Sequence, residues 1–122
     1  MKTMNRTLKM AMKLKPDTAQ FYPLMVYPGT PEYDRMKESG MLVTTDYEKW
    51  LTRDGLHNCI IRTSDSTPEE LIRFCDYSRR KFYLRPSYLF YKARKSVFDQ
   101  QEFRRTLKAF KVFMKHLYKP SV

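Results

Sequence analysis

The chain has 122 residues and a formal net charge of +11 at pH 7. An aromatic content of 15% with only three glycines excludes a linker or a low-complexity segment. No window approaches the roughly 18 apolar residues that a membrane-spanning helix needs, and the first residues lack the pattern of a secretory signal. We therefore expect one domain, or a piece of one, in the cytoplasm.

The first periodic segment covers residues 3–15. Met4, Leu8 and Met12 recur at helical spacing, and Pro16 follows directly. This pattern predicts an amphipathic helix that ends before the proline. It contains no cysteine or histidine, so we expect a structural role only.

The next stretch predicts a strand that turns sharply into a helix. Residues 18–26 are rich in aromatic and branched apolar side chains, which favour a buried, extended segment. Thr30 is suited to the N-cap of the following helix, and Pro31 to its first position. Gly40 marks the end of this short charged helix.

The turn itself, Tyr27-Pro28-Gly29-Thr30, has two interpretations. One is a plain connection between strand and helix. The other is a binding site, because the carboxyl ends of strands are where α/β folds place their ligands. Free N–H groups and the helix dipole at Pro31 favour a carboxylate or phosphate there, and Gly29 allows close approach to the backbone.

Residues 41–66 are less regular. Asp46 is placed to cap a short turn that runs through Trp50 and Leu51, and Gly55 would end this turn. Leu56–Arg62 is a candidate for a second short strand. We interpret this region as an irregular connection.

Three helices are expected after residue 66. Thr67-Pro68-Glu69-Glu70 is a capping box that opens the first, and Pro86 ends it. Ser87 opens a second helix that runs to about Val97. A second capping box at Asp99–Glu102 opens the last helix, which extends to about Tyr118.

The residues themselves predict no reaction. Cys59 and Cys75 are 16 apart without a metal-binding pattern, so we interpret both as reduced, packed thiols. His57 and His116 lack a nucleophile or acid at a supporting spacing. The pair of carboxylates at Glu69-Glu70 is explained by the capping box.

The positive charge is uneven along the sequence. Residues 1–78 hold 11 Lys/Arg and 11 Asp/Glu, whereas residues 79–122 hold 13 against 2. In the last helix the cations recur at i, i+4, i+7 and i+11: Arg104, Lys108, Lys111 and Lys115. This stripe is a solvated helix face, a surface for nucleic acid or anionic membrane, or a docking face for an acidic domain.

Aromatic side chains are interleaved with these charges, and two interpretations stay open for them. They are either base-stacking groups or core residues, and their helical spacing favours the core. They are Phe82, Tyr83, Tyr88, Phe90 and Tyr91.

The order of these motifs resembles a known family. The Tyr27–Thr30 turn precedes a Glu32-Tyr33 helix, and an aromatic segment with Trp50 follows. Next come the Thr67-Pro68-Glu69-Glu70-Leu71 helix and the sequence Arg79–Pro86. Over about residues 3–115 the chain is similar to the C-terminal end of radical S-adenosylmethionine enzymes of the cobalamin-binding type. Among enzymes of that type, the chain resembles the group that is similar to magnesium-protoporphyrin IX monomethyl ester oxidative cyclase.

The resemblance implies an iron-sulfur oxidoreductase, cyclase or methyltransferase-like enzyme built on an incomplete (β/α) barrel. Such enzymes hold a [4Fe–4S] cluster through a CxxxCxxC motif and use it to cleave S-adenosylmethionine. This chain lacks that motif and the cobalamin-binding region. We therefore expect no cofactor in this chain. The cluster, S-adenosylmethionine and cobalamin would belong to an upstream part of the same polypeptide, which is the expected partner.

The combined expectation is a mainly helical α/β fragment that is not catalytic alone. Residues 1–40 would end the barrel, 41–66 would connect, and 67–122 would form a helical extension of about three helices. Tyr27, Pro28, Gly29 and Thr30 would line the substrate or S-adenosylmethionine pocket. The alternatives are a stand-alone basic module for nucleic acid or anionic surfaces, and a purely structural interaction domain.

Overall fold

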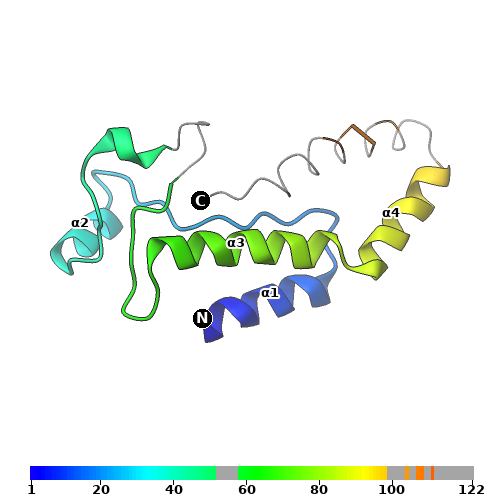
Figure 1. Cartoon of the computed structure of the whole chain (residues 1–122), viewed down its shortest axis with the longest axis horizontal. Helices are drawn as coiled ribbons and strands as arrows, with labels where there is room; N and C mark the ends of the chain where they lie inside the picture. Colours follow the sequence, from blue (N-terminus) through cyan, green and yellow to red (C-terminus); the bar gives the residue numbers. More distant parts are fainter. Residues whose placement is uncertain (52–57, 99–103, 105–106, 109–110, 112–122) are drawn as a thin grey trace. The chain divides into compact units, whose positions relative to one another are not determined.

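The computed structural model describes residues 1–51, 58–98, 104, 107–108 and 111. These residues are mainly helical, as expected from the sequence (Figure 1). In chain order the helices and the 3-10 turn η1 are α1 (Lys2–Leu14), α2 (Pro31–Glu38), η1 (Tyr47–Trp50), α3 (Pro68–Tyr83) and α4 (Pro86–Phe98).

Side-chain caps begin two of these elements. The Thr30 hydroxyl accepts the Tyr33 N–H at 3.3 Å, with Pro31 at the first position of α2. The Asp46 carboxylate accepts the Glu48 N–H at 3.1 Å and so opens η1. Each cap satisfies an N–H that has no partner within its helix, and both caps were predicted from the sequence.

The capping box of α3 is also confirmed. The Thr67 N–H donates to Glu70 Oε2 at 2.9 Å, and the Glu70 N–H donates to Thr67 Oγ1 at 3.3 Å. At the other end α3 stops at Tyr83 and α4 starts at Pro86. The end of α3 before Pro86 is as predicted, because the residue before a proline avoids helical dihedral angles. The predicted cap at Ser87 is wrong, since Pro86 is already the first residue of α4, where its missing N–H costs nothing.

The expected strands are largely missing. Residues 18–26 form neither helix nor strand in the structure. The candidate second strand is reduced to an isolated antiparallel bridge between Leu42 and Ile61, with the Val43 N–H donating to the Ile60 carbonyl at 2.8 Å. A strand needs a neighbouring strand for its backbone groups, and the described residues supply only such isolated bridges. The barrel unit therefore stays a prediction for a longer protein.

The chain divides into two compact units, and one boundary between them, after residue 75, falls within the sequence of α3. Unit 1 contains residues 22–75, and unit 2 contains residues 2–21 and 76–121. This division follows contacts in space, so it joins the first helix to the last third of the sequence. The three expected parts, 1–40, 41–66 and 67–122, stay predictions about the longer protein.

Unit 1 buries a cluster of apolar side chains from its loops and from the start of α3. The segment 59–61 is almost fully buried, and its Ile60 carbonyl accepts the Val43 N–H. The buried apolar residues of this unit are Val26, Tyr33, Trp50, Cys59, Ile60, Ile61, Leu71 and Ile72.

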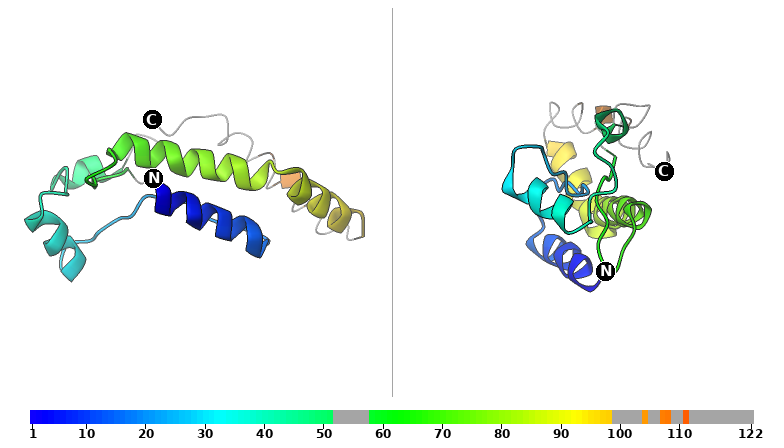
Figure 2. Two further views of the ribbon diagram at one scale, coloured as in Figure 1. Left: turned by 90° about the horizontal axis from the view of Figure 1, so that it is seen from below. Right: turned by 90° about the vertical axis from the view of Figure 1, so that its left-hand side faces the viewer.

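Unit 2 is organised around Phe82, whose side chain is completely buried. Its ring centroid lies 6.0 Å from that of Phe21 and 5.6 Å from that of Tyr88, and the Arg85 guanidinium sits 4.1 Å above it. Figures 1 and 2 show α1 beside the second half of α3, and Leu8 is the buried residue of α1. The predicted core role of Phe82 and Leu8 is confirmed.

The last predicted helix falls mostly outside the described residues, as does the capping box at Asp99–Glu102. Residues 104, 107, 108 and 111 are helical and exposed. No helix in the described part of the chain is long and apolar enough to cross a membrane.

We predict that Thr67→Ala lowers the free energy of unfolding by about 1 kcal/mol, because it removes the hydroxyl that accepts the Glu70 N–H. Urea unfolding followed by circular dichroism measures the change. Thr67→Ser should retain most of the stability, and Thr45→Ala, an exposed threonine outside any helix, should change little. An equal loss for Thr45→Ala would contradict the capping role.

Candidate functional site

The predicted pocket residues 27–30 form a tight turn in unit 1. The Thr30 N–H donates to the Tyr27 carbonyl at 3.2 Å, and the Thr30 hydroxyl donates to the same oxygen at 2.7 Å. Gly29 has φ +82°, a left-handed conformation that glycine adopts without strain. Proline followed by such a glycine is the pattern of a type II turn.

This turn faces open space. A Cβ added at Gly29 would meet no atom within 4 Å, and Tyr27 is 53% exposed. The backbone of the turn is therefore accessible to another molecule or another part of a longer protein. The four residues form this turn, and their role as a pocket wall stays a prediction.

An aromatic cluster lies behind the turn and holds it. The buried Trp50 ring lies 6.4 Å, 6.3 Å and 4.9 Å, centroid to centroid, from three tyrosine rings: Tyr27, Tyr33 and Tyr47. Tyr27 belongs to the turn and Tyr33 to α2, so Trp50 packs against both sides of the cap. The sequence places Trp50 in the turn capped by Asp46 and in the motif order but predicts no contacts for it. The density of tyrosines around it was the missed signal.

The Trp50 indole adds one unusual feature. Its Nε1–H is buried and has no hydrogen-bond partner among the described residues. A buried donor without a partner is costly, and buried tryptophans usually find an acceptor for this group.

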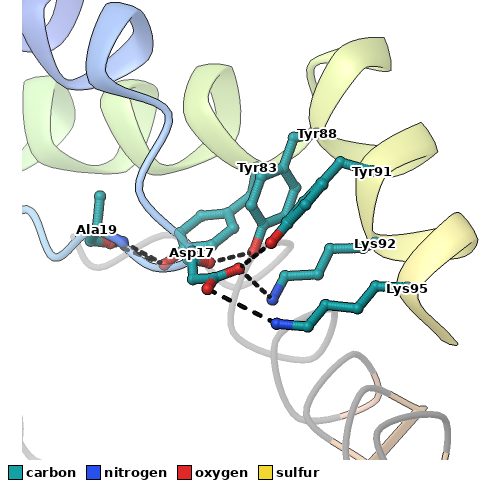
Figure 3. Close-up of polar contacts among 7 residues, drawn as sticks. All are labelled: Asp17, Ala19, Tyr83, Tyr88, Tyr91, Lys92 and Lys95. Atoms are coloured by element: carbon teal, nitrogen blue, oxygen red, sulfur yellow. Dashed lines mark hydrogen bonds and ion pairs between the residues drawn. The ribbon is translucent and has the colours of Figure 1, made fainter. Parts of the chain in front are cut away.

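A second cluster of polar groups lies in unit 2, around Asp17 (Figure 3). The Tyr91 hydroxyl donates to the Asp17 carboxylate at 2.9 Å, and Lys92 Nζ lies 3.4 Å from the same oxygen. Lys95 Nζ lies 3.8 Å from the other carboxylate oxygen. The Tyr91 hydrogen bond, followed by the charge of Lys92, lowers the pKa of Asp17 below its ordinary value.

Two further tyrosines bind the backbone beside Asp17. The Tyr83 hydroxyl accepts the Ala19 N–H at 3.0 Å and donates to the Ala19 carbonyl at 2.8 Å. The Tyr88 hydroxyl donates to the Asp17 carbonyl at 2.9 Å. Burial, and then the nearby Tyr83, raises the pKa of Tyr88 to about 12, so this hydroxyl stays protonated at neutral pH.

We call Asp17, Ala19, Tyr83, Tyr88 and Tyr91 the tyrosine clamp. Every hydroxyl in it is bonded to the segment 17–19, and the carboxylate is paired with lysines. Such a set orders a chain segment and leaves no base or nucleophile ready for catalysis. The sequence interpretation of these tyrosines as core or base-stacking groups missed their hydroxyls, because the contacts join residues 64 to 74 apart.

The predicted basic stripe is only partly described. Arg104, Lys108 and Lys111 are helical and exposed, whereas Lys115 lies outside the described residues. The use of the stripe stays a prediction.

The cysteines behave as packed thiols. Neither Cys59 nor Cys75 forms a disulfide within the described residues, and the Cys59 thiol donates to the Ile61 carbonyl at 3.4 Å. Burial raises the pKa of Cys59, which keeps it in the unreactive thiol form. His57 and His116 lie outside the described residues. Within the ranges that the structure describes, no three His, Cys, Asp or Glu side chains come together as a metal site.

Comparison with known proteins gives one similarity. A protein from Pyrococcus horikoshii that is named an uncharacterized methyltransferase is 30% identical to this chain over 97 residues. The aligned part covers 80% of this chain and 19% of that protein, so the chain spans about a fifth of the length of this relative. No family model matches the chain, and no solved structure matches it.

We predict that Tyr91→Phe raises the pKa of Asp17 toward the ordinary value of 3.8, because the hydroxyl is the largest cause of its lowering. Carboxyl chemical shifts followed by NMR from pH 6 to pH 2 measure the change. A carboxyl with a lowered pKa stabilises the fold above pH 3.8 and loses this contribution as the pH falls through the lowered value.

Tyr77→Phe is the matched control, since the Tyr77 hydroxyl contacts Lys81 at 2.6 Å on the exposed side of α3. It should leave the titration of Asp17 unchanged. If Tyr91→Phe also leaves it unchanged, Tyr91 does not hold this carboxylate in solution.

Proposed function

We propose that this chain is the C-terminal part of a larger methyltransferase-like enzyme of the radical S-adenosylmethionine class, and that it is not catalytic alone. The similarity to the methyltransferase-named protein carries the proposal, because it covers 80% of this chain but only 19% of the relative. The order of the capped turn, the Trp50 segment and the α3 capping box supports it. The name of the relative favours methyl transfer over ring formation.

In this proposal the turn at residues 27–30 forms part of the wall of the substrate or S-adenosylmethionine pocket. Its backbone is open to approach at Gly29, and the aromatic cluster around Trp50 fixes its position. The turn leads directly into the N-terminus of α2, where the helix dipole favours an anionic group such as a carboxylate.

The cofactors would be held elsewhere in the polypeptide. The described residues place no cysteine triad together, and the sequence has no CxxxCxxC motif, so this chain does not fit a [4Fe–4S] cluster. When bound upstream, the cluster would supply the electron that cleaves S-adenosylmethionine. In the same proposal cobalamin also belongs to the upstream part.

Residues 18–26 have a further role in the proposal. In the longer protein they would add a strand to the edge of the barrel and so help to close it. Their aromatic and branched side chains support this role. Ala19 is already bonded to Tyr83, so the added strand would begin after it.

The first experiment determines the reading frame and the mass of the protein made in cells. We expect a coding sequence that continues upstream of Met1 in the same frame and encodes CxxxCxxC. A stand-alone basic binding module, the alternative function, predicts a cellular protein of 14.8 kDa. A protein of that mass, encoded without an upstream continuation, would refute the proposed parent enzyme.

For the pocket, we predict that Gly29→Ala in the longer enzyme lowers kcat/KM by about tenfold, since misplacing a pocket wall disturbs the positioning of the substrate. Methyl transfer from S-adenosylmethionine and iron content are measured together. We expect the iron content to stay within about twofold of the parent, as the cluster would lie elsewhere.

Gly40→Ala is the matched control. Gly40 also has a positive φ, +66°, and a Cβ there also meets nothing within 4 Å. Both substitutions therefore impose a similar backbone strain of about 1 kcal/mol without a clash. Equal losses of activity for the two variants would mean that the turn has only a structural role.

A further inference from the structure

Helix α1 carries a continuous row of positive charges. Its four cations recur at i, i+4, i+7 and i+11, and its 13 residues include no acid: Lys2, Arg6, Lys9 and Lys13. With a rise of about 1.5 Å per residue, the row extends for roughly 16 Å along the helix. We call these four residues the α1 cationic row.

The row lies on the side of the helix away from the core. Leu8 is 2% exposed and faces the interior of unit 2, whereas all four cations are exposed. None of them forms an ion pair with a described residue. The whole row is therefore available to a partner.

Helix stability does not account for this arrangement. Lys2 stands in the first turn, where the helix dipole disfavours a cation. Like charges four residues apart, as at Lys2 and Arg6 or Lys9 and Lys13, also repel each other. A helix face that only contacts solvent would be more stable if acidic residues alternated with the cations.

The rest of unit 2 strengthens the positive field. Residues 2–21 and 76–98 hold 12 Lys/Arg and 2 Asp/Glu, whereas residues 22–75 of unit 1 hold 6 and 9. Both acids within residues 2–21 and 76–98 are paired, Asp76 with Arg79 and Asp17 with Lys92 and Lys95. The excess positive charge thus belongs to one compact unit. Counting charges before and after residue 78 does not show this, because unit 2 also contains residues 2–21.

We propose that the α1 cationic row binds the phosphate backbone of a single-stranded nucleic acid. Cations with no acid among them are suited to a polyanion, and binding releases the counterions of its phosphates. An exposed aromatic ring of the same unit is suited to stack on unpaired bases, because Phe90 is 73% exposed. A membrane surface fits less well, because Met4, Leu8 and Met12 on the apolar face of α1 are buried or half-buried, which leaves Met10 and Leu14 as its exposed large apolar side chains. This inference does not depend on the proposed enzyme.

The experiment measures fluorescence anisotropy of a labelled 16-nucleotide single strand, as RNA and as DNA, between 50 and 200 mM KCl. In one variant all four cations of the row become glutamine, which has a similar helix propensity. We expect its affinity at 100 mM KCl to fall at least about tenfold. The slope of log K against log salt should become shallower by up to about 3, since single strands contribute roughly 0.7 per phosphate contact.

The matched control removes the same charge from unit 1. Arg35, Lys37, Lys49 and Arg73 are exposed, and all four become glutamine. This variant should lose less than about threefold, because residues 22–75 hold 9 acids against 6 cations and so offer no continuous cationic surface. Equal losses in both variants, or no loss in the first, would overturn the proposal. A third variant with Lys2, Lys9 and Lys13 changed to arginine keeps the charge and should bind like the parent.

Two further measurements separate the partners. Phe90→Ala should weaken binding of the single strand without changing the salt slope, and an unchanged affinity would overturn the stacking part of the proposal. Vesicles of 30% phosphatidylserine in phosphatidylcholine are the competing surface. If the chain binds them more tightly than the single strand, and loses this binding with the α1 cationic row, the row serves a membrane and the proposal is wrong. Circular dichroism confirms that each variant is folded.

Discussion

Among the residues that the structure describes, the segment 17–19 has no neighbouring strand, and three tyrosine hydroxyls bind its polar groups instead. Tyr83 both donates to and accepts from Ala19, as a paired residue in a neighbouring strand would. The Tyr88 hydroxyl donates to the Asp17 carbonyl, and the Tyr91 hydroxyl donates to the Asp17 carboxylate. Residues 17–19 are exposed or half-buried, so these hydroxyls do not rescue buried groups. They take the place of a neighbouring strand and tie the segment to α3 and α4. The Arg85 guanidinium binds the backbone of α1, since it donates a hydrogen bond to the Met12 carbonyl at 3.3 Å.

Local signals in the sequence predicted the helices and their ends. Thr30, Asp46 and Thr67 act as caps, and the prolines at 31, 68 and 86 stand at helix starts, since capping is decided within a few residues. The strand predicted over residues 18–26 is absent from the structure, because the pairing of a strand depends on segments that are distant in the sequence. The same reason explains why the tyrosine clamp and the aromatic cluster around Trp50 could not be derived.

The candidate site was predictable in position but not in surroundings. Proline followed by glycine at 28 and 29 identifies a turn, and the structure gives Gly29 the positive φ that such a turn requires. Nothing in the spacing indicates that Tyr27, Tyr33 and Tyr47 meet on one indole. Likewise, counting charges along the sequence assigned the basic excess to the last third, whereas the fold adds α1 to it.

The indole at position 50 is the sole tryptophan of the chain. Its emission therefore reports on unit 1 alone, through a buried ring that contacts three tyrosines from the turn, α2 and η1. Melting of unit 2 would leave this signal unchanged, provided that the two units open separately. A difference between the fluorescence and circular dichroism transitions would then measure how strongly α3, which belongs to both units, couples their unfolding.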